Sequence, residues 1–168
     1  LNGRDFRSLL RLNTGVTEPQ GGISVTPSIR RQGFNDGIKN IHDAQQLLDA
    51  GAKEEAASTF AVAITRLGKA RQLRSGNAQT VRNLATAYAL GGDFNGAEKL
   101  LRTGITECAA DTSAYILTDA LKTVRANKSA ALVDAKKYDD AIDYYIELTM
   151  QEQTNPDLWM GLGNSYYN

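Results

Sequence analysis

The chain has 168 residues, 42% hydrophobic and 23% charged, which is an ordinary globular balance and enough for one domain with a sizeable core. Lys plus Arg equals Asp plus Glu at 19 each, so no global field favours nucleic acid or an anionic membrane as partner. Cys108 is the one cysteine, which excludes an internal disulfide, and no run of about 18 apolar residues predicts a transmembrane helix.

Residues 1–37 differ from the rest of the chain in their frequent glycine and proline. Six glycines and two prolines interrupt the stretch too often for a long helix, and only residues 5–12 have a helical pattern. Residues 23–26 alternate between apolar and polar, which is typical of a short extended segment. We therefore predict an irregular, extended arm over 1–37. Because the chain begins with Leu1 rather than Met, we expect a processed product or an excerpt.

From residue 38 onward, apolar residues recur with the 3.6-residue period of helices, and we assign one helical domain to residues 38–168. Gly51 ends the first helix, and Gly91-Gly92-Asp93 supplies a turn after a later one. The predicted helices cover residues 38–50, 53–74, 78–90, 94–108, 112–135, 138–152 and 157–167.

Two spacing patterns recur in these helices. The motif W-x2-L-G-x2-Y of residues 159–166 places its four residues at offsets 0, 3, 4 and 7, which is one helical face with a gap at Gly163. We expect a neighbouring backbone to approach there, because glycine has no Cβ. The same offsets recur at Val81, Leu84, Ala85 and Tyr88. The second pattern is a small residue, then a large residue four positions later, and then a small or apolar residue three positions after that. It occurs three times, at Ala56, Phe60 and Ala63; at Ala97, Leu101 and Gly104; and at Ala141, Tyr145 and Leu148.

These two patterns resemble the first and second helices of the tetratricopeptide repeat. The resemblance covers about residues 38–168 and implies an all-α solenoid of helical hairpins with the last repeat incomplete. Ala56 and Ala97 are 41 positions apart (97 − 56), and Ala97 and Ala141 are 44 apart (141 − 97), against about 34 in the standard unit. We therefore expect the helix of residues 53–74 to continue through Leu73. A longer helix is expected over 112–135, with a break near Asn127 as an alternative.

The family fold has a concave groove lined by the first helix of each hairpin, so the resemblance implies that polar residues there bind a partner. The groove candidates are Gln45, Arg82, Thr86 and Asn164. A solvated surface is the alternative interpretation of the same residues. Ile41 and Met160 stand where chaperone-binding members need a cation, so that activity is not implied. The sequence thus predicts a non-enzymatic module that binds a protein or peptide.

No combination of residues in the sequence predicts catalysis, a metal site or a cofactor. His42 has no second His or Cys placed to share a metal. Cys108 has no base nearby in sequence, and Gly161-Leu162-Gly163 lacks the strand and lysine of a phosphate loop. Asp139, Asp140 and Asp143 are expected on the solvent side of their helix.

The arm has a resemblance of its own, to part of the plug of TonB-dependent outer-membrane receptors. It comprises Leu1-Asn2-Gly3-Arg4-Asp5-Phe6, Leu9, Leu10, Leu12, Gly15 and Val16, and then Asp36-Gly37-Ile38 and Asn40. It implies a bacterial envelope or extracellular location and, as an alternative function, an accessory protein of outer-membrane uptake. No barrel follows, so transport itself does not carry over.

An internal similarity is the alternative interpretation of the arm. Residues 1–6 and 9–10 resemble residues 90–94 and 100–101, the turn and following helix of a repeat. An arm of this kind would either pack within its own chain or complete the last repeat of a neighbouring copy. The second, head-to-tail contact forms an open filament. The interface candidates are then Phe6, Leu9 and Leu10 in the arm, and Trp159, Leu162, Tyr166 and Tyr167 in the last helix.

Overall fold

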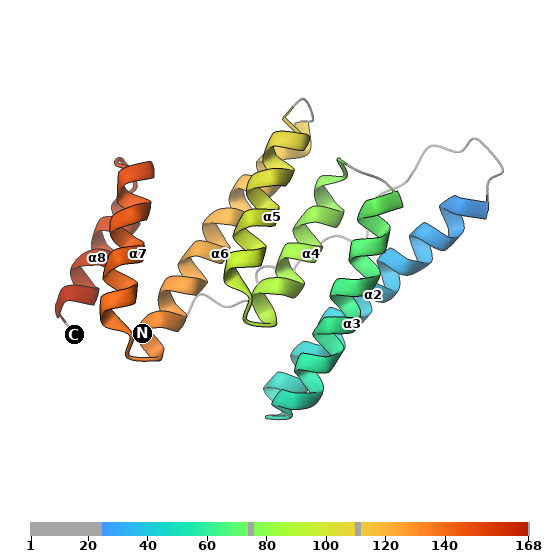
Figure 1. Ribbon diagram of the computed structural model, residues 1–168, viewed down its shortest axis with the longest axis horizontal. Coiled ribbons are helices and arrows are strands. Elements are labelled where there is room, and N and C mark those ends of the chain that lie inside the picture. The colour runs from blue at the N-terminus through green and yellow to red at the C-terminus, as the bar shows by residue number, and fades with distance from the viewer. Residues whose placement is uncertain (1–24, 74–75, 110–111, 168) are drawn as a thin grey trace. The chain divides into compact units, whose positions relative to one another are not determined.

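The computed structural model describes residues 25–73, 76–109 and 112–167, and within these ranges every regular element is helical (Figure 1). The elements are α2 (Val25–Asp49), α3 (Lys53–Leu73), α4 (Ala78–Leu90), α5 (Phe94–Glu107), the 3-10 turn η1 (Thr112–Ala114), α6 (Tyr115–Asp134), α7 (Tyr138–Gln151) and α8 (Pro156–Tyr167). The described residues divide within α6 into two compact units. The first ends at Val124, and the second begins at Arg125.

Helix α2 corrects the prediction for the end of the arm. It begins at Val25, so residues 25–37 are helical rather than extended. Gly37 is buried, and a Cβ on it would lie 2.6 Å from Cγ of Leu67 on α3. This glycine therefore permits close packing of two helices instead of ending one. The arm's remaining predicted features, including the short helix at 5–12, lie outside the described residues.

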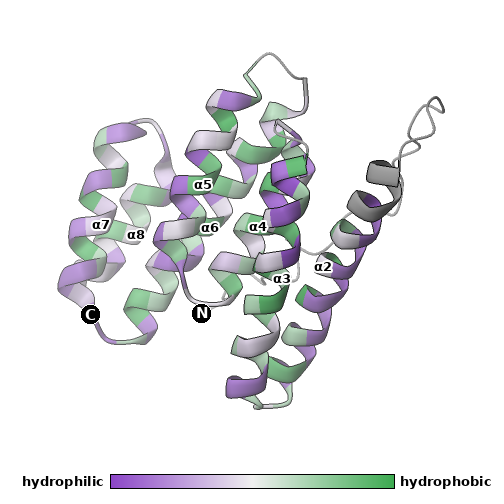
Figure 2. Ribbon diagram, turned by 45° about the vertical axis from the view of Figure 1, so that its right-hand side comes forward, coloured by the Kyte–Doolittle hydropathy of each residue, from purple (hydrophilic) through white to green (hydrophobic). Residues whose placement is uncertain are grey.

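The first unit begins with the α2–α3 hairpin and α4, which share one apolar cluster. Ile41 and Ala44 of α2 contact the predicted small-and-large face of α3, and Leu84 and Ala87 of α4 close the cluster. Phe60 and Leu67 are its largest fully buried side chains on α3. Helix α3 continues to Leu73, as the long spacing between repeats predicted. Figure 2 shows apolar and polar residues mixed along each of these helices, as amphipathic packing requires.

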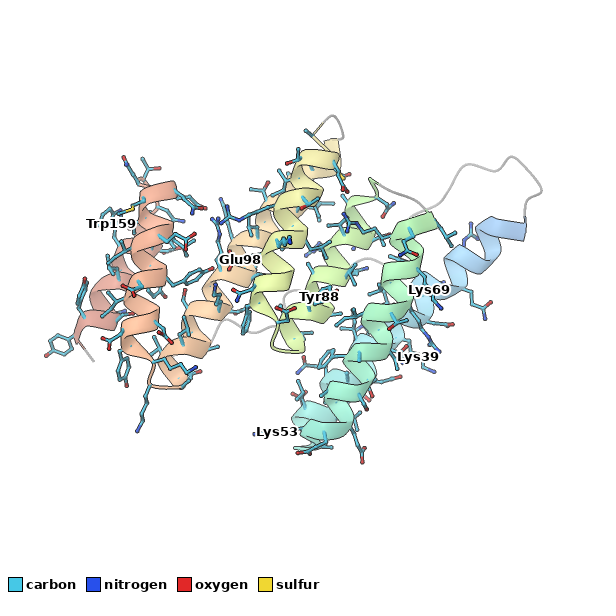
Figure 3. All side chains as sticks on the ribbon, in the orientation of Figure 1. Lys39, Lys53, Lys69, Tyr88, Glu98 and Trp159 are labelled. Atoms are coloured by element: carbon cyan, nitrogen blue, oxygen red, sulfur yellow. The ribbon has the colours of Figure 1, made fainter. Side chains whose placement is uncertain are left out.

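A second cluster joins α4, α5 and the beginning of α6. Val81 and Ala85 of α4 meet Leu101 of α5 and Leu117 of α6, and all four are almost fully buried. Asn77 and Asp93 cap α4 and α5, because each side chain accepts a hydrogen bond from a backbone N–H in the first turn. Tyr88, labelled in Figure 3, packs against both clusters and so connects α2–α3 with α4–α6.

The second unit consists of the end of α6 with α7 and α8, and its interior contains many polar groups. Arg125 donates one hydrogen bond to Glu152 and another, of 2.9 Å, to Oε1 of Gln151. The ammonium of Lys128 lies 3.8 Å from the ring centre of Tyr144, within cation–π range. These contacts attach α6 to α7. Helix α6 runs through Asn127, so the alternative of a break there is wrong.

Candidate functional site

Four exposed large apolar side chains of the second unit lie on α8. Trp159 is 52% exposed, Tyr166 64% and Tyr167 94%, whereas Leu162 is half-buried. All four are predicted interface residues, and α8 leaves three of them open to solvent. We call Trp159, Met160, Tyr166 and Tyr167 the α8 surface.

Helix α8 packs against α7 through the face that carries Gly161 and Ser165. A Cβ on Gly161 would overlap the ring of Tyr145, and Ser165, one helical turn later, is 2% exposed. At Gly163 a Cβ would meet nothing within 4 Å, so no described residue approaches this glycine, and the expected close approach stays a prediction about a partner. Two positions along an α-helix differ by about 200° around its axis, so Gly163 lies on nearly the opposite side of α8 from Gly161.

Trp159 is held by one polar contact even though its ring is exposed. Its Nε1–H donates a 2.9 Å hydrogen bond to the backbone oxygen of Gln153, in the turn between α7 and α8. Figure 3 shows the labelled side chain beside this hairpin. A fixed aromatic ring loses little conformational freedom when a partner covers it, which suits an interface anchor.

Two methionines extend the exposed apolar side chains of this unit beyond the predicted residues. Met160 on α8 is 61% exposed, and Met150 near the end of α7 is 72% exposed. The sequence singled out Met160 only because it stands where chaperone-binding repeats need a cation. Met150 was not among the predicted interface residues. A methionine flanked by polar residues, as in Thr149-Met150-Gln151, is the signal that could have found it.

The structure brings two of the groove candidates together on α4. Arg82 and Thr86 are 8% and 3% exposed, so they are buried rather than a solvated surface. The Thr86 hydroxyl donates a 3.0 Å hydrogen bond to the backbone oxygen of Arg82. Between them, Asn83 accepts a 3.4 Å hydrogen bond from Nε2 of Gln79. We call these four residues the α4 polar face.

The Arg82 guanidinium has an unusual environment for a charged group. Its Nε is fully buried, and no described residue accepts a hydrogen bond from it. Desolvation by burial lowers the pKa of Arg82, while the negative charge of Asp119 and the phenol of Tyr115, both on α6, raise it. No described carboxylate lies within 4.0 Å of this side chain. The site therefore holds a cation whose charge is incompletely balanced.

The other groove candidates do not join Arg82 and Thr86 on α4. Gln45 lies on α2, where its Nε2 donates a 3.2 Å hydrogen bond to Asp49 and its Oε1 is buried without a described donor. Asn164 is exposed on α8, in the other compact unit. Phe6, Leu9 and Leu10 lie outside the described residues.

The residues set aside as catalytic candidates are separated from one another. His42 is exposed on α2, whereas Cys108 is buried and its thiol lies 3.2 Å from the backbone oxygen of Gly76. Across the described part of the chain, no three His, Cys, Asp or Glu side chains are placed to hold a metal ion. None of the described helices combines the length and apolar character needed to cross a membrane.

Comparison with known proteins yields no counterpart. No protein-family model, no curated protein and no solved structure matches the chain. Function is therefore inferred from the surfaces described above.

Proposed function

We propose that the protein is a non-enzymatic interaction scaffold that binds another protein chain through the α8 surface. The observation that carries this proposal is the exposure of Trp159, Met160 and Tyr166 together on one short helix. Aromatic residues and methionine are enriched at protein interfaces, and exposed apolar residues that gather in this way mark sites where a partner excludes water.

The proposal includes a tetratricopeptide-like arrangement of the hairpins. What supports it is the burial of the residues that the repeat pattern selects. Ala56, Ala97 and Ala141, the small residues that open the three second helices, are each 0% exposed. The large residues Phe60 and Leu101 are 2% and 0% exposed, and Tyr145 packs on Gly161 of the next helix. In such repeats a helix buries its outer face only against a following one, so the α8 surface suits a helical partner.

In the self-assembling version of this scaffold, the partner is a second copy of the chain. The similarity of residues 1–6 and 9–10 to the turn and helix that follow α4 supports it. Phe6, Leu9 and Leu10 would then supply the covering apolar side chains. A head-to-tail contact of this kind extends into a filament.

Photo-crosslinking tests the proposed interface. A benzophenone amino acid is introduced in place of Tyr166 and, as a matched control, in place of Tyr115, which is 71% exposed in the other unit. In cells that naturally produce the protein, we expect a defined adduct from position 166 and none from position 115. An adduct of twice the chain mass identifies self-assembly, and another mass identifies a different partner. Equal labelling at both positions, or none at 166, contradicts the proposal.

Trp159 provides a second readout, because it is the one tryptophan of the chain. If copies of the chain cover the α8 surface, Trp159 emission shifts to the blue as protein concentration rises. Tyr166→Ser should abolish this shift, and Tyr115→Ser should leave it unchanged. An emission maximum that is independent of concentration in the wild type excludes the self-assembling version alone.

A further inference from the structure

Helix α4 has an unusual distribution of polar residues for a helix at the centre of its unit. Its apolar face carries Val81, Leu84, Ala85 and Tyr88, and belongs to the two cores. The α4 polar face occupies offsets 0, 3, 4 and 7 from Gln79, which is a second continuous stripe along the helix. Three of its four residues are at most 9% exposed. The polar stripe is therefore enclosed almost as fully as the apolar one.

Some hydrogen-bonding groups on this stripe are already used. The Thr86 hydroxyl proton goes to the backbone of Arg82, and one Gln79 amide proton goes to Asn83. Arg82 differs from the other three residues because it has a fully buried polar atom without a partner among the described residues. Its Nε is buried without an acceptor among the described residues. A buried guanidinium without its acceptor is costly, since both desolvation and unmade hydrogen bonds oppose folding.

We propose that Arg82 is a binding site for a carboxylate group. A guanidinium presents a planar pair of N–H donors that matches the two oxygens of a carboxylate, and enclosure strengthens such a charge-assisted pair. Arg82 as a residue is 8% exposed, and of its three guanidinium nitrogens only Nε is a fully buried atom without a partner, so the proposed carboxylate approaches the two terminal nitrogens. The site lies on α4 in the first unit and does not depend on the α8 surface of the proposed function.

The neighbouring groups on α6 favour a monoanion over a phosphate. Asp119 is near enough to raise the pKa of Arg82, and its own charge repels a second negative charge brought to the site. A carboxylate adds one negative charge, whereas a phosphate monoester adds up to two. Asp119 therefore acts against multiply charged ligands, and its removal should strengthen anion binding at Arg82.

Nuclear magnetic resonance of the arginine Nε–Hε groups tests this site directly in the full chain. Titration with acetate, and with a blocked peptide containing one Glu, should shift the Arg82 resonance and leave that of exposed Arg66 in place. Tighter binding of the Glu peptide than of acetate identifies a protein segment as the source of the carboxylate. Equal affinities identify a small free carboxylate. Inorganic phosphate should bind more weakly than either probe.

Two variants make the test decisive. Asp119→Asn, at an exposed position, should tighten acetate binding by a few fold and reduce the discrimination against phosphate. Arg82→Lys keeps the charge but loses the planar donor pair, so affinity for the Glu peptide should fall about tenfold, with circular dichroism checking the fold. An Arg82 resonance unmoved by both carboxylate probes, or phosphate binding tighter than acetate binding, overturns the proposal. An affinity for acetate that is unchanged in Asp119→Asn contradicts the role proposed for Asp119.

Discussion

At the scale of single residues, small differences in position separate a glycine that packs from one that does not. Gly37 and Gly161 each receive a side chain from the facing helix, and Gly104 lies against Val81. Gly68 and Gly163 have open space where a Cβ would lie. The helical pattern alone treats these glycines alike, because the space around each depends on the neighbouring helix.

Gly104→Ala and Gly68→Ala should therefore have opposite effects on stability. At Gly104 the new Cβ would lie 2.6 Å from Cγ1 of Val81 and 3.1 Å from Cδ1 of Leu117, so we expect a loss of about 1–3 kcal/mol. At Gly68 a new Cβ would meet nothing within 4 Å beyond its own stretch of helix backbone, and the better helix propensity of alanine should add up to about 1 kcal/mol. Urea unfolding measures both. A stabilising Gly104→Ala would contradict the close contact.

Arg82→Met should stabilise the protein although it removes a charge from a buried helix. The pKa of Arg82 is lowered by desolvation, so folding disfavours the charged form, and this cost is present at neutral pH, below the pKa. A methionine of similar length removes it, and we expect a gain of about 1 kcal/mol. The measurement is the urea midpoint at pH 7, with Arg66→Met as the exposed control. A loss of stability in Arg82→Met would show that the guanidinium is already satisfied.

At the scale of helices, α6 contributes to both compact units. Its first half supplies Leu117 and Val124 to the core with α4 and α5. Its second half carries Arg125, whose side chain is 7% exposed and bonded to the end of α7 and the residue that follows it. One long helix thus supplies apolar core residues in one unit and, in the other, a buried arginine that pairs with a partly exposed glutamate.

Removal of the acid that pairs with the buried Arg125 should cost more than removal of the acid from a pair with no buried member. Glu152→Ala takes the carboxylate from the buried Arg125, although Glu152 itself is 29% exposed, and we expect a loss of about 1–3 kcal/mol. Glu107→Ala breaks the Arg71–Glu107 pair, in which both side chains are partly solvated, and should cost about 0.2–1 kcal/mol. Thermal unfolding compares the two variants. Equal losses would indicate that water reaches Arg125 as readily as Arg71.

At the scale of the whole chain, the two compact units have different interiors. The first contains two apolar clusters joined through Tyr88. The second buries Ala141, Tyr144 and Leu148 together with polar Ser129, Thr149 and Ser165. A smaller apolar interior contributes less hydrophobic stabilisation, so the second unit should open more readily than the first.

Hydrogen exchange of a reciprocal pair of variants tests the division into units. Leu101 and Leu148 are both 0% exposed, one in each unit. Leu101→Ala should remove about 2–5 kcal/mol of packing and raise amide exchange in α4 and α5 more than in α7. Leu148→Ala should raise exchange in α7 and α8 and leave α4 protected. Uniform increases along the chain in both variants would show that the described residues open as one unit.

The sequence alone determined the helix positions from residue 53 onward and the small-and-large faces of α3 and α5, because burial along a helix imposes a 3.6-residue period that is readable locally. Only the tertiary structure decided which glycines are contact points, why α2 extends back to Val25, and which face of α8 meets α7. The enclosure of Arg82 and the exposure of Met150 were also decided there. These features depend on atoms that distant helices bring together, and no local period encodes which side of a helix receives a neighbour.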